Sequence, residues 1–277
     1  MKRELLPNHL RGPLRVAAKS GFLTKRIWND FFATGNRFWR FRRWQSLMAS
    51  GYFKSVPDYG FAESAVTLTD TGKILAISLG MEPVYSPPAK NLWHDEELIR
   101  LALFLERQGW VSNWTTEQEF KISRRAEHFF QNQIRAAKIP DLIIEWSTSP
   151  KPTLWAIELE RTRKEFSRYY DMVGAYKGIS CIESVLIIVA TSSIEANIKK
   201  AQAKMDYPQN QRPMFFASMK EVIDDPISCE LRQGANCMAL GKFAKALTGK
   251  SAMEPELNAK ISGNNVGNIV SYKGEVA

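Results

Sequence analysis

The chain has 277 residues, 44% hydrophobic and 24% charged, a balance typical of a globular protein and unlike that of a disordered or collagen-like chain. Its longest strongly apolar run, residues 185–190, is far shorter than the roughly 20 residues of a membrane span, and three cysteines without a CxxC pair argue against a disulfide framework or a cysteine zinc site. Because no apolar stretch follows the charged start of the chain, we expect no signal peptide, no membrane contact and a cytoplasmic location.

The net charge of +9 is unevenly distributed along the chain. Residues 1–80 contain 13 Lys and Arg against 5 Asp and Glu, whereas the rest of the chain contains 25 against 24. A positive excess confined to one segment is typical of a module that binds a polyanion such as DNA, although a basic patch is also often a plain solvated face.

Residues 10–80 are predicted to form three short helices followed by a two-stranded wing. Gly21 ends the first helix, Thr24 is a suitable N-cap for the second, and the third begins after Asn36 and ends at Gly51. Two short β segments separated by a turn-rich stretch come next, and a further helix closes the segment. This order resembles a winged helix-turn-helix, in which the third helix enters the major groove and the wing touches the DNA backbone.

Basic residues gather on the second and third of these helices. Arginine forms bidentate contacts with phosphates and guanine edges, and unpaired cations are costly to bury. We therefore predict that DNA is contacted by Lys25, Arg26, Arg37, Arg40, Arg42 and Arg43. The aromatic residues of the third helix are predicted to be mostly core: Phe38, Trp39, Phe41 and Trp44. The main alternative is that the winged helix docks a protein.

The predicted domain organisation has four parts. Residues 1–82 form the winged-helix domain, residues 83–91 a proline-containing linker, residues 92–245 a second domain, and residues 246–277 a polar, mobile tail. Because helices and strands alternate in the second domain, we expect an α/β (α+β) fold with a mixed sheet flanked by helices.

The elements of the second domain follow from periodicity and turn signals. In chain order they are a helix at 92–110, a short strand at 117–122, a helix or extended insertion at 124–138, strands at 141–146 and 153–160, a helix at 163–178, a strand at 184–190, a helix at 193–205 and a last strand at 214–219.

Three acidic residues in the predicted hairpin are candidates for catalysis. Asp141 begins one strand, while Glu158 and Glu160, two residues apart, point to the same side of the next. Converging carboxylates repel one another unless a hard cation such as Mg²⁺ or Mn²⁺ lies between them. Such an ion can polarise a phosphodiester and lower the pKa of bound water. Taken singly, Glu160 could be solvent-exposed and Asp141 a turn cap.

Pro140-Asp141 on one strand and Glu158-x-Glu160 on the next, between two helices, resemble the PD-(D/E)xK nuclease core over residues 92–190. The resemblance implies a metal-dependent DNA endonuclease, with Asp141, Glu158 and Glu160 catalytic and with Asp141 and Glu158 binding Mg²⁺ or Mn²⁺. Glu160 occupies the position where the family has lysine.

Other residues complete the site that this resemblance implies. Lys164 is expected one turn into the following helix. From there its ammonium group could reach the place that the family's lysine occupies. The acid that the family carries on its first helix, a further metal ligand, would fall on Glu97, with Asp95 and Glu117 as alternatives.

A predicted winged helix comes first, His94-Asp95 follows at a helix start, and the glutamate-rich strand comes later. With these features, residues 10–205 resemble the plasmid replication-relaxation and MobC-type relaxase group. This implies nicking of double-stranded DNA at a transfer origin of a plasmid or mobile element, with accessory mobilisation proteins as partners. A homodimer would suit a palindromic site.

Two alternatives stay open. The chain could be a non-catalytic DNA-binding regulator on a degenerate nuclease fold, which the missing lysine favours, or a transposition-type nuclease that cleaves element ends. We expect Tyr169 and Tyr176 to pack in the core or at its rim, although a nucleophilic role for these or for Tyr170 is an alternative. The chain lacks the phosphate-loop, dinucleotide-binding and HExxH motifs, which argues against ATP hydrolysis, dinucleotide redox chemistry and zinc proteolysis.

Overall fold

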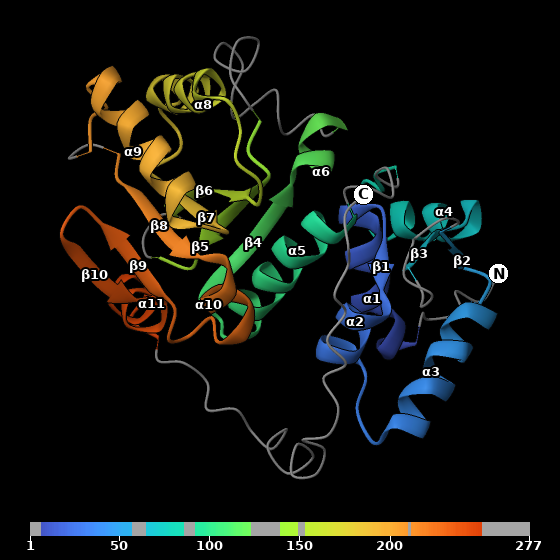
Figure 1. Cartoon of the computed structure of the whole chain (residues 1–277). Helices are drawn as coiled ribbons and strands as arrows, with labels where there is room; N and C mark the ends of the chain where they lie inside the picture. The colour runs from blue at the N-terminus through green and yellow to red at the C-terminus, as the bar shows by residue number, and fades with distance from the viewer. Residues whose placement is uncertain are drawn as a thin grey trace, which may run out of the picture.

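The computed structural model describes residues 7–56, 65–85, 92–122, 139–148, 153–209 and 212–250. Within these residues the fold is mixed α/β, as expected. A smaller N-terminal unit contains a three-stranded sheet, and a larger unit beside it contains a seven-stranded sheet (Figure 1). Over the same ranges, no helix has both the length and the apolar character needed to cross a membrane.

The N-terminal unit contains the three helices expected from the sequence and one strand more than expected. Its elements are α1 (Asn8–Ser20), β1 (Leu23–Thr24), α2 (Lys25–Ile27), the π-helical turn η1 (Trp28–Phe32), α3 (Arg37–Ala49), β2 (Phe53–Ser55), β3 (Ala65–Leu68) and α4 (Asp70–Ser78). The three strands are antiparallel in the order β1-β3-β2. The turn expected at 57–60 lies outside the described residues.

Local capping sets the ends of these helices as predicted. Gly21 ends α1 in the left-handed conformation, with φ of 81°. The side chain of Thr24 accepts a hydrogen bond from the Ile27 backbone N–H, and that of Asn36 accepts one from the Trp39 N–H. The short sequence signals therefore position α3, the helix that carries most of the predicted DNA contacts.

The larger unit contains the expected hairpin and mixed sheet. Its elements are α5 (Leu92–Arg107), β4 (Val111–Thr116), α6 (Glu117–Ile122), β5 (Leu142–Trp146), β6 (Thr153–Glu160), α8 (Phe166–Gly178), β7 (Ser184–Val189), α9 (Ser192–Met205), β8 (Met214–Ser218), α10 (Met219–Asp224), β9 (Glu230–Gln233), β10 (Asn236–Ala239) and α11 (Leu240–Thr248). The sheet order is β10-β9-β8-β7-β6-β5-β4. Among the described strands, β6 pairs in parallel with β7, and β7 with β8.

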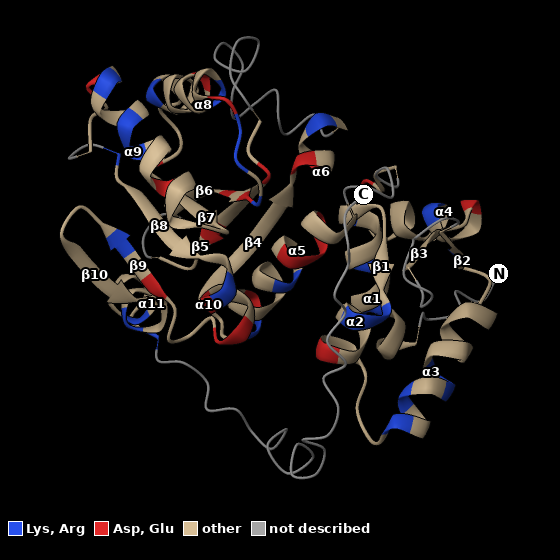
Figure 2. Cartoon of the chain, viewed as in Figure 1, with Lys and Arg blue, Asp and Glu red and all other residues tan. Residues whose placement is uncertain are grey.

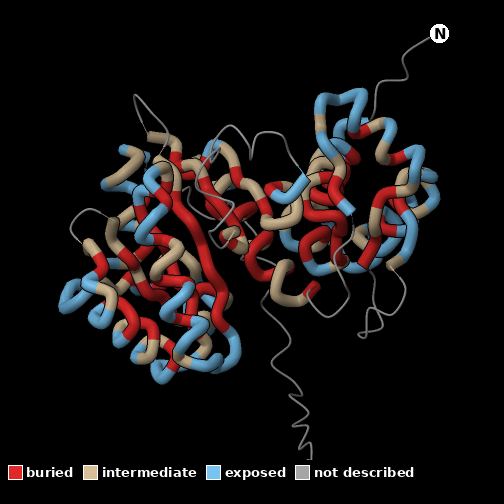
Figure 3. The backbone as a smooth tube through the Cα atoms, turned by 90° about the horizontal axis from the view of Figure 1, so that it is seen from above, coloured by how far each residue is buried: buried red, intermediate tan, exposed pale blue. Residues whose placement is uncertain are grey.

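Helices cover both faces of this sheet (Figure 1), and its central strands are buried (Figure 3). The alternation of side chains along each strand separates two cores. Ile157 and Leu159 of β6 pack in the core formed with α5 and α11, whereas Ala156 packs in the core formed with α8 and α9. By the same alternation, Glu158 and Glu160 lie on the α8 face.

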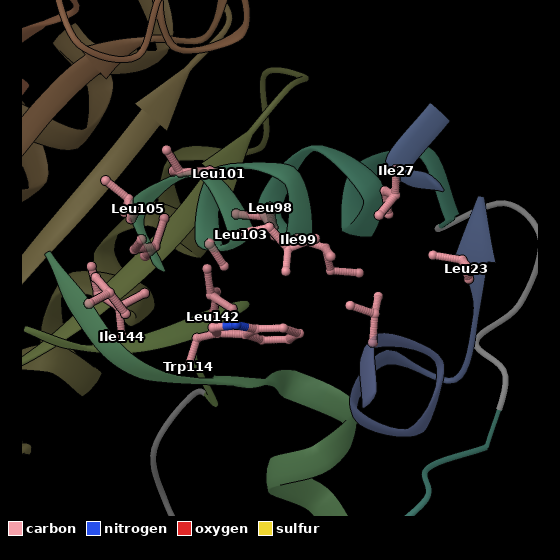
Figure 4. Close-up of a cluster of buried hydrophobic side chains, with 14 of the residues drawn as sticks. Leu23, Ile27, Leu98, Ile99, Leu101, Leu103, Leu105, Trp114, Leu142 and Ile144 are labelled. Carbon is pink, nitrogen blue, oxygen red and sulfur yellow. The ribbon is translucent and has the colours of Figure 1, made fainter. Parts of the chain in front are cut away.

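The two units share one continuous hydrophobic core. Figure 4 shows part of it, in which Leu23 and Ile27 of the N-terminal unit belong to the same cluster as Ile99 of α5 and Trp114 of β4. Val84, in the segment expected to be a linker, is buried, and its N–H donates to the Ala18 carbonyl over 2.8 Å. The units therefore pack as one body.

Several sequence-based expectations about the second unit are wrong. Residues 117–122 form helix α6 and not a strand, because the preceding segment forms β4 and Thr116 accepts a hydrogen bond from the Glu119 N–H as a helix cap does. The strand at 214–218 is not the last, since β9, β10 and α11 follow it and α11 continues to Thr248. The element expected at 124–138 lies outside the described residues.

The helix expected at 163–178 begins later than predicted, at Phe166. Lys164 therefore lies in the loop before α8 and not one turn into the helix. This difference matters for the site, because the loop directly continues the strand that carries Glu158 and Glu160.

Candidate functional site

The surface of α3 is the first candidate site. Trp44 and Leu47 are buried, but Phe38, Trp39 and Phe41 are 55%, 53% and 47% exposed. The prediction that these aromatic residues are mostly core is therefore wrong. The buried residues Trp44 and Leu47 lie in the C-terminal half of α3, whereas residues 37–43 are exposed or only partly buried, so the first half of the helix does not pack against the core.

Two of the four arginines of α3 donate to neutral acceptors. Arg40 Nε donates to the Gly35 carbonyl over 2.8 Å, and Arg43 Nη1 donates to Thr34 Oγ1 over 2.7 Å. Arg37 and Arg42 are exposed, and α3 itself contains no acidic residue. Figure 2 shows basic residues and no acidic ones along the ribbon of this helix. Positive charge at this surface is therefore not neutralised within the helix.

The two basic residues predicted on α2 differ in their surroundings. Lys25 Nζ lies 5.7 Å from the centroid of the Phe41 ring, so Lys25 belongs to the α3 surface. Arg26 Nη1 instead donates to Glu97 Oε1 on α5. The structure thus groups Lys25 with Arg37, Arg40, Arg42 and Arg43, and directs Arg26 towards the other unit.

The carboxylate cluster at the ends of β5 and β6 is the second candidate site. Asp141 Oδ2 accepts a hydrogen bond from the Leu159 N–H over 3.0 Å and lies 3.3 Å from His94 Nε2. His94 Nδ1 is 3.0 Å from Asp95 Oδ1. Burial lowers the pKa of His94, but the hydrogen bonds and charges of Asp141 and Asp95 outweigh burial and raise the pKa to about 10. His94 is therefore a cation at neutral pH.

Glu158 and Glu160 are both buried on β6. The Tyr176 hydroxyl of α8 donates to Glu158 Oε1, and burial together with Glu158 raises the pKa of Tyr176 well above its ordinary value. Lys164 Nζ lies 2.8 Å from Glu160 Oε2. The lysine thus reaches the carboxylate of β6 as expected, although from a loop.

The tyrosines of α8 follow the sequence-based prediction. Tyr169 and Tyr176 are buried in the core between α8 and the sheet. The Tyr169 hydroxyl accepts a hydrogen bond from the Lys164 backbone N–H over 2.9 Å, which fixes the loop that carries Lys164. Tyr170 is 39% exposed.

The acidic candidates outside the hairpin do not all reach the cluster. Glu97 is bonded to Arg26 and Arg100, so the structure does not bring it to Asp141. Asp95 and Glu117 do line a small pocket together with Asp141. His94, which the sequence suggests only as a helix-start contact, is the residue that links Asp95 to Asp141.

In this structure the carboxylates of the cluster are paired with groups of the protein itself. The carboxylate oxygens of Asp141 and Glu158 are of the kind that Mg²⁺ and Mn²⁺ prefer, but both side chains have partners within the protein. In the part of the chain that the structure describes, no group of three or more His, Cys, Asp and Glu side chains is placed to hold a metal ion. His94 and Lys164 supply the positive charge that balances Asp141 and Glu160.

Comparisons with known proteins place no further constraint on the site. No protein-family model, curated protein or solved structure matches this chain.

Proposed function

We propose that this protein binds double-stranded DNA through α3 and the surrounding surface of the N-terminal unit. The observation that carries the proposal is the concentration of arginines on the outward faces of a helix without acidic residues. Arginine side chains so placed can contact phosphates and base edges, as they do when a recognition helix enters the major groove.

The order of elements supports a winged-helix arrangement for this unit. Three helices precede β2 and β3, and the short strand β1 completes a sheet in the order β1-β3-β2. In such an arrangement α3 is the recognition helix, and β2 and β3 are the strands of the wing.

For the larger unit, the geometry favours a role without DNA cleavage, so we infer that the protein is a regulator on a nuclease-like fold. His94 balances the negative charge of Asp141, and Lys164 balances that of Glu160. Glu158 accepts a hydrogen bond from the Tyr176 hydroxyl. A site whose negative charge is already balanced by neighbouring side chains has less affinity for a divalent cation.

A second candidate function is a site-specific DNA endonuclease of PD-(D/E)xK type, such as a relaxase that nicks a transfer origin. The pairing of Leu142 with Ile157 supports this candidate, because it places Asp141 and Glu158 at neighbouring ends of β5 and β6. Lys164 beside Glu160 supports it as well. This function would need the carboxylates to rearrange around Mg²⁺ or Mn²⁺, with a homodimer and accessory mobilisation proteins as its expected partners.

DNA binding can be tested by fluorescence anisotropy on a duplex from the region flanking the gene. We expect Arg37→Gln combined with Arg42→Gln to weaken binding and to make the salt dependence shallower, by about one unit of slope for each phosphate that the variant no longer binds. Arg11→Gln, at an exposed arginine on α1, is the matched control. Equal binding by the α3 double variant and the Arg11 variant would contradict the proposal.

Cleavage can be tested on supercoiled plasmid that carries the same flanking DNA, with Mg²⁺, with Mn²⁺ or with EDTA. The regulator predicts intact plasmid in all three. Open circles that require metal and disappear with Asp141→Ala would establish the nickase instead, and linear product would indicate the transposition-type nuclease. The assay is repeated with cell extract, so that a missing accessory protein does not imitate inactivity.

A further inference from the structure

We propose that the exposed aromatic residues of α3 stack on unpaired bases, so that the preferred ligand is DNA with a short unpaired segment next to duplex. This inference rests on the proposed DNA binding and names the class of DNA. It concerns a surface that we call the aromatic face, formed by Phe38, Trp39 and Phe41.

The aromatic face is an unusual feature for the surface of a protein. Three large rings within four positions are about half exposed, and the Phe38 and Trp39 rings meet edge to face with centroids 6.1 Å apart. Clustered exposed apolar side chains mark interaction sites more often than scattered ones do. The rings belong to a helix that is capped by Asn36 and anchored in the core by Trp44 and Leu47 of its C-terminal half.

Cations accompany these rings. The Arg42 guanidinium lies 4.7 Å from the Phe38 centroid, and Lys25 Nζ lies 5.7 Å from the Phe41 centroid. Aromatic rings interleaved with basic side chains are the combination that holds single-stranded nucleic acid, because the rings stack on bases while the cations contact the phosphates.

Stacking on base faces explains why the aromatic face should prefer unpaired DNA to paired DNA. In duplex DNA the faces of the bases are covered by their neighbours, and only their edges are open to the grooves. Arginines alone would suit those edges and the phosphates, whereas Phe38 and Phe41 offer no hydrogen bonds to them. The rings gain most from base faces, which only an unpaired or unstacked segment exposes.

The inference is tested with three DNA ligands of the same sequence: full duplex, duplex with a central unpaired bubble, and single strand. We expect Phe38→Ala combined with Phe41→Ala to weaken binding to the bubble and the single strand at least about tenfold, with a much smaller change for the duplex. Both side chains are exposed, so the variant should fold, which circular dichroism verifies. The matched control is Ile74→Ala with Ile77→Ala, two exposed apolar residues on α4.

The position of Trp39 provides a second readout. We expect its fluorescence, taken as the difference between wild type and Trp39→Phe, to be quenched by the bubble and not by the duplex. Equal weakening for all three ligands, or no weakening, would overturn the inference. So would a loss of self-association with unchanged DNA affinity, because the aromatic face would then be a protein interface. If wild type binds none of the three ligands, the proposed DNA binding itself fails.

Discussion

Arg26 on α2 donates a hydrogen bond to the carboxylate of Glu97 on α5, which joins the two units of the protein. Arg100 reaches the other oxygen of the same carboxylate over 2.8 Å and also contacts Asp30 over 3.0 Å. The sequence alone predicts Arg26 at the DNA and Glu97 at a metal ion. Their pairing indicates that both residues hold the N-terminal unit against α5.

Replacing Arg26 should therefore reduce stability more than DNA affinity. We expect Arg26→Gln to lower the free energy of unfolding by about 1 to 3 kcal/mol, the usual cost of removing one partner from a buried acceptor, because Glu97 is buried. Urea unfolding measures this change, and anisotropy on duplex DNA should show an effect near that of Arg11→Gln.

The coupling between these residues can be measured with Glu97→Gln and the double variant. We expect the two effects on stability to be non-additive by about 0.5 to 3 kcal/mol, as for residues in one ion-pair network. Strict additivity would show that the ion pair contributes nothing measurable.

Protonated His94 should make stability depend on pH. Its pKa is raised from 6.5 to about 10 in the folded protein, so the stabilisation is fully present below pH 6.5 and is lost as the pH rises towards 10. We expect the difference in unfolding free energy between wild type and His94→Gln to be constant in mildly acidic solution and to shrink from neutral to alkaline pH. A difference that grows over that range would contradict the assignment.

The hydroxyl of Tyr176 should stabilise the buried Glu158 carboxylate. Tyr176→Phe removes a donor to a charged acceptor and is expected to cost about 1.5 to 3 kcal/mol. Tyr176→Phe in a Glu158→Gln background should cost less, because the amide carries no charge. Thermal unfolding of the four proteins measures both effects, and equal costs in the two backgrounds would argue against the interaction.

Close packing at Gly72 should restrict that position to glycine. A Cβ atom there would lie 2.2 Å from the Tyr52 carbonyl oxygen. We expect Gly72→Ala to destabilise the protein by about 1 to 3 kcal/mol, the usual cost of overpacking, although alanine is the better helix former. The control is Thr71→Ala at the neighbouring exposed position, and equal unfolding midpoints for the two variants would refute the prediction.

Much of the secondary structure could be predicted because its signals are local. Thr24, Asn36 and Gly21 define helix ends through contacts within a few residues. The alternation along β6 likewise places Glu158 and Glu160 on one face. Prediction fails where local signals compete. Residues 117–122 form a helix and not the predicted strand, because Thr116 caps the start of this helix.

The composition and spacing of the sequence thus determined the mixed fold, the main helices and strands, and the basic character of the N-terminal unit. The tertiary structure decided which partner each side chain contacts. Glu97 pairs with Arg26, 71 positions earlier in the chain, and His94 lies beside Asp141. It also decided that Phe38 and Phe41 face outward. Spacing fixes only the direction of a side chain from its own helix or strand, whereas its partner is set by elements that are distant in the chain and close in space.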